Sequence, residues 1–205
     1  MNIEIRKLTP NNVDDYACFF DTTPHNNANK GDKCYCVTFC NDKVYHGGGE
    51  HWYPTPDERR THGIKRVMEG DIQGYLAYSE DNVIGWCNAN AKTNCQFVIA
   101  NMQTRAGVPV EDCRADEKIK SVFCFAIAPK VQKMGIATRL LEHICKEAAT
   151  EGFDFVEAYT HRDFIQDGFR GTLTLYKNCG FSIYAEKDGK LVVRKELKNM
   201  HRFVH

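Results

Sequence analysis

Long hydrophobic runs and an excess of one charge are both missing from this 205-residue sequence. No stretch of about 18 apolar residues occurs, which argues against a membrane-spanning helix. Lysine plus arginine and aspartate plus glutamate each number 27, and there is no dense basic segment of the kind that nucleic-acid-binding proteins carry. The first ten residues alternate apolar and polar side chains without a signal-like apolar core. We therefore expect a cytoplasmic, soluble protein that binds neither nucleic acid nor membrane.

Several familiar catalytic motifs are also absent. The sequence contains no Gly-x-Ser-x-Gly nucleophile elbow, no phosphate loop ending in Gly-Lys-Ser or Gly-Lys-Thr, and no His-Glu-x-x-His pair. These absences remove the main support for a hydrolase, a nucleoside triphosphatase or a zinc metalloprotease. His143 and Glu147 stand one helical turn apart, and a solvated helix face explains them.

Cysteine, by contrast, is abundant, with ten residues. In a short secreted chain this number would suggest disulfides, but the length and the missing signal core favour reduced thiols. Cys34, Cys36 and Cys40 cluster near three histidines, and thiolates with imidazoles are the ligands that zinc prefers: His25, His46 and His51. Cys34 and Cys36 do not have the usual gap of about two to four residues between paired zinc ligands. We therefore predict no metal and favour plain packing or a thiol-lined pocket wall.

Periodicity along the chain predicts a mixed α/β fold. We expect strands over residues 3–8, 74–79, 82–91, 121–129, 153–160, 181–186 and 190–197, and helices over 11–20, 56–70, 135–152 and 172–180. A strand-helix-strand unit requires one parallel pair with a crossover, near 121–128 and 155–160. The rest of the central sheet is expected to be mostly antiparallel and flanked by helices. We expect a single domain over 1–205, with an irregular Cys-rich insertion at about 21–56.

The stretch "VQKMGIA" at 131–137 lies where the clearest helix begins. The first backbone N–H groups of a helix lack partners, and the helix dipole favours a negative ligand there. Gly135 would let the backbone approach an anion closely, and the small Ala137 would keep a side chain out of the way. Residues 132–137 are therefore a candidate phosphate-binding turn. A purely steric need for glycine between strand and helix is the alternative.

The segment "FAIAPKVQKMGIATRLLEHICKEA" resembles motif A of the GNAT superfamily of acyl-CoA-dependent N-acetyltransferases. That pattern is Gln or Arg, two residues, Gly, one residue, then Gly or Ala, and Gln132, Gly135 and Ala137 stand in those places. "LYKNCGF" at 175–181 is similar to motif B, and "GYLAYSEDNVIGWC" to the central hairpin of that family. The resemblance extends over about residues 74–197.

This resemblance implies acetyl-CoA as the co-substrate. The turn would hold the pyrophosphate of coenzyme A, with the following residues at the cofactor-binding positions: Gln132, Lys133, Met134, Gly135, Ile136, Ala137 and Thr138. The strand near Ile127 would pair with the pantetheine arm as if the arm were another strand. A backbone N–H near Ile127 would then be the natural donor to the developing oxyanion.

Acyl transfer to an amine requires a neutral nucleophile, a polarised thioester carbonyl and a proton for the leaving thiol. The resemblance places Tyr176 at the motif B tyrosine that commonly supplies this proton, and the alternative is a core aromatic paired with Leu173. Glu157, a carboxylate on a central strand, is the candidate general base, with a structural ion pair as the alternative. His161 and Asp163, just beyond that strand, are further candidates.

One position departs from the family pattern. Many relatives carry an asparagine that touches the pantetheine seven residues before the motif B tyrosine, whereas this chain has Phe169 there, with Gly171 and Thr172 following. We therefore expect the motif B helix to begin later than in those relatives.

Together these features predict an N-acetyltransferase that moves an acetyl group from acetyl-CoA to an amine by direct transfer. The acceptor is a small molecule or a peptide and is expected to enter beside 21–56 and the helix at 59–69. Trp52 and Tyr53 are candidates for a wall of its site. The alternative is a non-catalytic acyl-CoA-binding or sensor domain. An exposed sheet edge could support a homodimer.

Overall fold

The computed structural model describes residues 2–23, 33–38, 53, 55–95, 99, 117–163 and 169–197. Its centre is a seven-stranded sheet with the order β1-β2-β3-β4-β5-β7-β6. The strands are β1 (Glu4–Lys7), β2 (Gly74–Ser79), β3 (Asn82–Ala91), β4 (Ile119–Ile127), β5 (Phe155–His161), β6 (Ser182–Lys187) and β7 (Lys190–Glu196). β4 and β5 run parallel, and the other neighbours in this sheet are antiparallel. The predicted fold class is confirmed.

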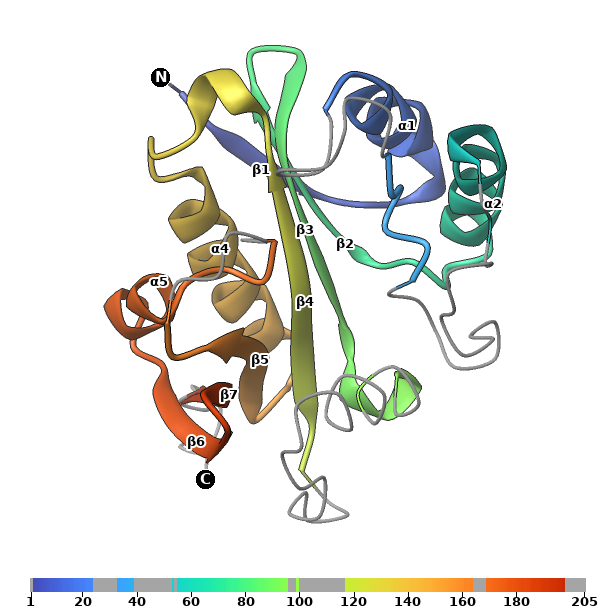
Figure 1. Ribbon diagram of the computed structural model, residues 1–205. Helices are drawn as coiled ribbons and strands as arrows, with labels where there is room; N and C mark the ends of the chain where they lie inside the picture. Colours follow the sequence, from blue (N-terminus) through green and yellow to red (C-terminus); the bar gives the residue numbers. More distant parts are fainter. Residues whose placement is uncertain are drawn as a thin grey trace, which may run out of the picture.

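Helices cover both faces of the sheet (Figure 1). α1 (Val13–Thr22) and α2 (Pro56–Met68) lie on one face, and α4 (Ile136–Thr150) and α5 (Leu173–Asn178) lie on the other. α5 begins at Leu173 with Thr172 as its N-cap, within the helix expected over 172–180. In the described parts of the chain, no helix is both long and apolar enough to cross a membrane.

Much of the predicted insertion at 21–56 lies outside the described residues. These undescribed positions include Cys40, Trp52 and the three histidines that the zinc alternative requires. The described segment 33–38 is held against the body by arginines of α2: Arg59 Nε donates to the Lys33 carbonyl at 2.7 Å, and Arg66 Nη1 to the Val37 carbonyl at 3.0 Å. This part of the insertion therefore belongs to the packed structure.

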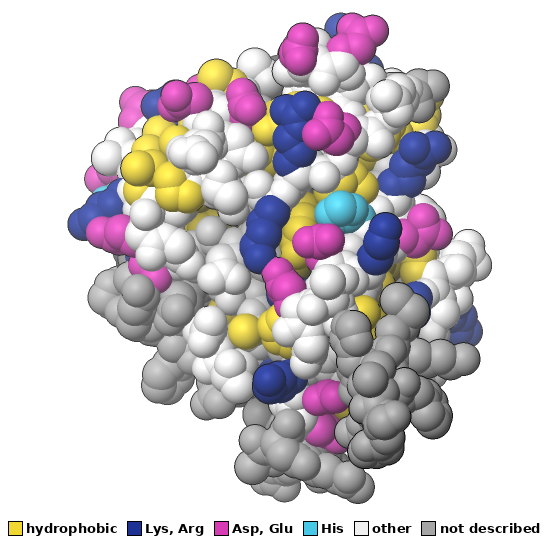
Figure 2. All heavy atoms as spheres, turned by 180° about the vertical axis from the view of Figure 1, so that it is seen from behind, with side chains coloured by type: hydrophobic (Ala, Val, Ile, Leu, Met, Phe, Trp, Pro, Cys, Tyr) yellow, Lys and Arg dark blue, Asp and Glu magenta, His cyan; other side chains and the backbone are white. Residues whose placement is uncertain are grey.

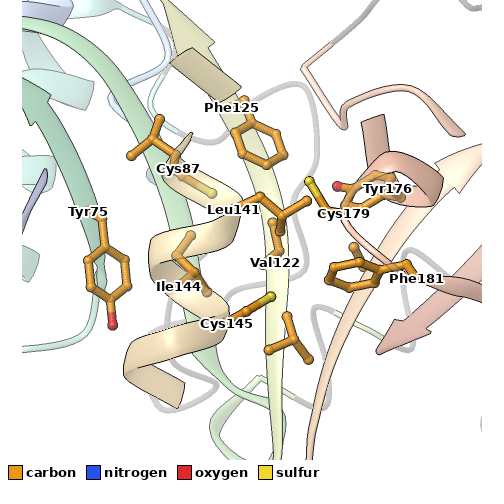
Figure 3. Packing of buried hydrophobic residues seen from close by; sticks show 14 of the residues in the cluster. Tyr75, Cys87, Val122, Phe125, Leu141, Ile144, Cys145, Tyr176, Cys179 and Phe181 are labelled. Atoms are coloured by element: carbon orange, nitrogen blue, oxygen red, sulfur yellow. The ribbon is translucent and has the colours of Figure 1, made fainter. Parts of the chain in front are cut away.

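α4 supplies one side of the main hydrophobic core. Its buried residues recur at spacings of three and four, as an amphipathic helix requires: Ile136, Leu140, Leu141, Ile144, Cys145 and Ala148. Figure 3 shows Leu141 and Ile144 between Tyr75 on β2 and the residues of α5 and its following turn. This packing fixes the N-terminus of α4 relative to the end of β4.

α1 packs an aromatic cluster on the opposite face. Tyr16 and Phe20, one turn apart on α1, contact Trp86 of β3 edge to face, with ring centroids at 5.2 and 6.3 Å. Cys124 of β4 joins the same cluster, so β4 is covered on both faces. On the side of the molecule seen in Figure 2, acidic and basic side chains of the described residues are interspersed.

β4 carries an irregularity next to its pairing with β5. Asn88 of β3 faces Cys124 while Ala89 faces Val122, so Phe123 is an extra residue of the bulge type. The parallel pairing with β5 runs from Ile119↔Phe155 to Val122↔Ala158 and stops there, although both strands continue. The carboxyl halves of β4 and β5 therefore separate, as ligand sites at the carboxyl ends of parallel strands require.

The α4 core provides a direct test of the packing. Leu141 is fully buried, so Leu141→Ala removes buried methyl groups and leaves a cavity. We expect a loss of about 2–5 kcal/mol in the free energy of unfolding, measured by urea denaturation. Met68→Ala is the control, because Met68 is 54% exposed at the end of α2. Equal effects of the two substitutions would contradict this account of the core.

Candidate functional site

The N-terminus of α4 has an open backbone turn. Gly135 is its N-cap, with φ 81° in the left-handed region, and no side chain among the described residues caps the helix. Arg139 N–H makes the first bond of the helix, to the Gly135 carbonyl. The N–H groups of the three residues between them are thus the unpaired donors of a helix start, at the positive end of the helix dipole: Ile136, Ala137 and Thr138.

Space beside this turn is free. A Cβ atom built on Gly135 would meet no atom of the described residues within 4 Å, and Lys133 also has a positive φ of 63°. Ile136 is 2% exposed and turns its side chain into the core beside Gly85, so it can offer a ligand its backbone alone. Gln132 Nε2 donates to the Ile127 carbonyl at 3.2 Å and ties the turn to the end of β4.

The structure therefore brings the predicted cofactor positions together. Ile127 ends β4, and residues 132–138 follow as one continuous turn into α4. Met134 is 56% exposed, so this part of the turn lies at the surface. The arrangement suits a diphosphate, because several N–H groups converge at a helix N-terminus where small residues allow a close approach.

Past the β4 bulge, one backbone donor has an unexpected partner. Phe125 N–H donates to the Phe169 carbonyl at 2.5 Å, a contact between β4 and the segment that leads into α5. Neither Phe125 nor Phe169 was predicted to take part in this contact. The sequence signal available was the replacement of the family asparagine by Phe169.

Tyr176 lies on α5 beside the separating strands. Its ring is 1% exposed and packs against Phe181 and Phe125, with centroids at 5.4 and 6.5 Å (Figure 3). The hydroxyl donates to the Arg170 carbonyl at 2.6 Å. Burial raises the pKa of Tyr176 well above its ordinary value of about 10, so the hydroxyl keeps its proton at neutral pH. The residue is thus a core aromatic, and it also carries a proton near the end of β4.

Glu157 sits on β5 in a buried network of charges. Its side chain is fully buried; Oε1 accepts from Lys92 Nζ and Tyr159 Oη, both at 2.7 Å, and Oε2 accepts from Arg194 Nη2 at 2.7 Å and Nε at 3.1 Å. Burial alone would raise its pKa, but the Lys92 charge and the hydrogen bonds of the three partners lower it overall. This geometry fits the ion-pair alternative, because a carboxylate so stabilised binds a proton poorly.

The two further base candidates lie at the carboxyl end of β5. His161 Nε2 is 3.5 Å from Arg170 Nη1, close to the segment that contacts β4. Asp163 is exposed beyond the strand. Of the two, His161 is the one that the structure places at the opening between β4 and β5.

The cysteines that were candidates for a metal site are partly accounted for. Cys36 and Cys124 are buried, with their sulfur atoms 3.0 Å apart, and Asn88 Nδ2 donates to Cys36 Sγ at 3.4 Å. Among the described residues, no group of three or more His, Cys, Asp or Glu side chains could hold a metal ion. Because Cys40 and the histidines lie outside that part, the zinc alternative stays untested.

Solved structures similar to this one share the arrangement of strands and helices. An acetyltransferase of the GNAT family from Streptococcus pneumoniae is 17% identical, with a TM-score of 0.52 over 96% of this chain and 99% of that chain. The PaiA N-acetyltransferase from Thermoplasma acidophilum, in complex with coenzyme A, is 15% identical, with a TM-score of 0.53 over the same shares. The ribosomal-protein-S18-alanine N-acetyltransferase from Escherichia coli is 11% identical, with a TM-score of 0.50 over 100% and 99%.

At these identities the solved structures establish the fold alone. None of the curated proteins matches the chain in sequence. The model of the acetyltransferase (GNAT) family, however, matches residues 40–181, which is more than half of the chain and contains both the α4 turn and Tyr176. The chain is therefore a member of the GNAT family of acetyltransferases.

Proposed function

We propose that this protein transfers an acetyl group from acetyl-CoA directly to an amine. The observation that carries the proposal is the uncapped, left-handed turn at Gly135, tied to the end of β4 beside the separation of β4 and β5. The turn would hold the pyrophosphate of coenzyme A, and the edge of β4 past Val122 would pair with the pantetheine arm. The coenzyme A bound by the Thermoplasma relative supports this choice of co-substrate.

The chemistry of the transfer follows from these positions. The amine lone pair attacks the thioester carbon, and the negative charge that develops on the carbonyl oxygen needs a donor, for which Phe125 N–H past the bulge is best placed. The carbon–sulfur bond then breaks, and the departing thiolate takes a proton. Tyr176 supplies that proton in this proposal and is reprotonated with the proton that the amine nitrogen loses as the amide forms.

Two side chains are candidates for the base that accepts the amine proton. Glu157 as general base stays a prediction, and its four hydrogen bonds support the structural alternative more strongly. His161 lies nearer to the opening and has an imidazole that can accept a proton near neutral pH. An amine that arrives in its neutral form needs no strong base.

The acceptor is proposed to enter on the face that α1 and α2 cover. There the Tyr53 ring stacks on His62, with centroids 3.9 Å apart, and its hydroxyl accepts from Arg66 Nη2 at 3.0 Å. Such a fixed aromatic can form a wall of an acceptor site. The Escherichia coli relative is named for a protein alanine, and a small-molecule amine or a peptide amine fits the present chain equally. The rival proposal, a non-catalytic sensor, predicts binding of acetyl-CoA without turnover.

The anion-binding turn is tested by Gly135→Asp. A carboxylate in the turn repels the diphosphate, so we expect the Kd for acetyl-CoA in calorimetric titration to rise at least about tenfold, or about 1.4 kcal/mol. Gly152→Asp is the matched control, because Gly152 ends the same helix with φ 78° and equally open space. Undiminished acetyl-CoA binding by Gly135→Asp would show that the glycine only allows the backbone to turn and that the turn does not hold the diphosphate.

The proton donor is tested by Tyr176→Phe. After wild-type protein has been screened against amines and peptides by chromatographic detection of coenzyme A, we expect the variant to lose roughly a hundredfold in kcat. The variant should still bind acetyl-CoA, since the ring that fills the core is retained. A variant that acetylates at the wild-type rate would remove Tyr176 from the mechanism.

The two readings of Glu157 are separated by Glu157→Gln. If the residue is structural, the change leaves buried cations uncompensated and costs about 3–5 kcal/mol of unfolding free energy. Because the folded pKa is lowered, the stabilisation is complete above the unfolded carboxyl pKa of about 4.3 and is lost as pH falls through the folded value. The difference between wild type and variant should therefore shrink in acid, as followed by thermal unfolding.

Glu186→Gln provides the control for Glu157, since Glu186 pairs with Arg162 at the surface and should affect stability far less. If Glu157 is instead the general base, its variant should fold with near wild-type stability and lose turnover. Loss of turnover without loss of stability would thus overturn the structural reading.

A further inference from the structure

Residues 169–171, which we call the strap, lie across the opening between β4 and β5 (Figure 1). At one end, the Phe169 carbonyl accepts the Phe125 N–H of β4 at 2.5 Å. At the other end, the Gly171 carbonyl accepts Thr160 Oγ1 of β5 at 2.7 Å. The strap thus connects the two strands just where their own parallel pairing has stopped.

The middle of the strap is held as well. The Arg170 carbonyl accepts the Tyr176 hydroxyl at 2.6 Å, so three successive carbonyls bind β4, α5 and β5 in turn. Gly171 has φ 74°, a left-handed conformation that other residues rarely adopt, and a Cβ there would lie 3.2 Å from the Tyr176 ring. The strap is therefore a specified conformation of the chain.

The side chain of Phe169 anchors the strap on the far face. It packs with the apolar cluster under α1 and α2, which also takes in Tyr53 and Ala126 of β4. The strap thus starts on the face proposed for the acceptor and leads to α5 on the other face. Its contacts join both halves of the proposed active site.

We propose that the strap occupies, in the coenzyme-free protein, the edge of β4 that acyl-pantetheine would take, and that coenzyme binding displaces it. This inference rests on the proposed function. One backbone N–H, that of Phe125, cannot serve the Phe169 carbonyl and a thioester carbonyl at full strength together. Coenzyme binding therefore exchanges an internal hydrogen bond for one to the thioester. The apparent affinity for acetyl-CoA is reduced by the fraction of molecules whose strap is closed.

The strap should weaken the binding of one half of coenzyme A and leave the binding of the other half unchanged. In the proposed complex the pyrophosphate and nucleotide would lie at the α4 turn, whereas the pantetheine and thioester would lie along β4. The hydrogen bonds of the strap go to β4, α5 and β5. Weakening the strap should then improve the binding of acetyl-CoA without changing the binding of its nucleotide diphosphate half. This difference separates the strap from a general effect on folding.

The experiment compares two variants that loosen the strap from different ends. Phe169→Ala removes the apolar anchor, and Thr160→Val removes the hydrogen bond to the Gly171 carbonyl while keeping the side-chain shape. Val83→Ala is the matched control, because Val83 packs on the same apolar cluster from the β2–β3 hairpin. The Kd of each protein is measured by calorimetry for acetyl-CoA and for the nucleotide diphosphate half, after thermal unfolding has confirmed the fold.

We expect both strap variants to bind acetyl-CoA about three- to tenfold more tightly than wild type, as follows if the strap is open in a minor fraction of molecules. Their Kd for the nucleotide half should match wild type, and Val83→Ala should match wild type for both ligands. Unchanged or weaker acetyl-CoA binding by both strap variants, or equal shifts in Kd for the two ligands, would contradict the proposal about the strap and leave the proposed function standing. If no protein binds acetyl-CoA, the proposed function fails and the role of the strap fails with it.

Discussion

The separation of β4 from β5 after Val122 is the constraint on which the site depends. A paired sheet has no free edge in its middle, but the extra residue at Phe123 shifts the register of β4, and the parallel ladder ends one residue before it. β4 then continues to Ile127 with an edge that faces the opening. Everything proposed for the thioester, the oxyanion and the strap follows from this interruption of an otherwise continuous sheet.

The hydrophobic core places the N-terminus of α4, the positive end of its dipole, at that opening. Six buried side chains fix α4 against the sheet, and Ile136, the first residue of the helix, is among them. Because the packing extends to the first residue, the uncapped N–H groups above it are held in position before any ligand arrives. Binding of the diphosphate should therefore cost little conformational entropy at the turn. At the strap, by contrast, a preformed contact has to be broken.

The helices, the strands and the α4 turn could be predicted from the sequence because each depends on residues that are close together in the chain. The spacing of Leu140, Ile144 and Ala148 predicts the helix, and Gly135 before it predicts the open turn. The bulge at Phe123 and the Phe125–Phe169 hydrogen bond were not predicted. Both arise from pairing between segments far apart in the chain, and they involve backbone atoms that leave no residue signature.

The partners of Glu157 could not be predicted for the same reason, because they come from segments far apart in the chain. The sequence left two readings open, because a carboxylate on a central strand must find partners or face a cavity. The two cations that pair with Glu157 support the ion-pair interpretation: Lys92 lies in the turn that follows β3, and Arg194 lies on β7. Only the sheet order, with β7 beside β5, brings Arg194 within reach.

Hydrogen exchange of the wild-type protein with and without acetyl-CoA tests the central claim most directly. The account predicts added protection of backbone amides at 123–127 on β4 and at 133–138 in the α4 turn, with the rest of the sheet unchanged. Binding of acetyl-CoA without added protection in these two segments, or with protection concentrated elsewhere, would contradict a site built on the separation of β4 and β5.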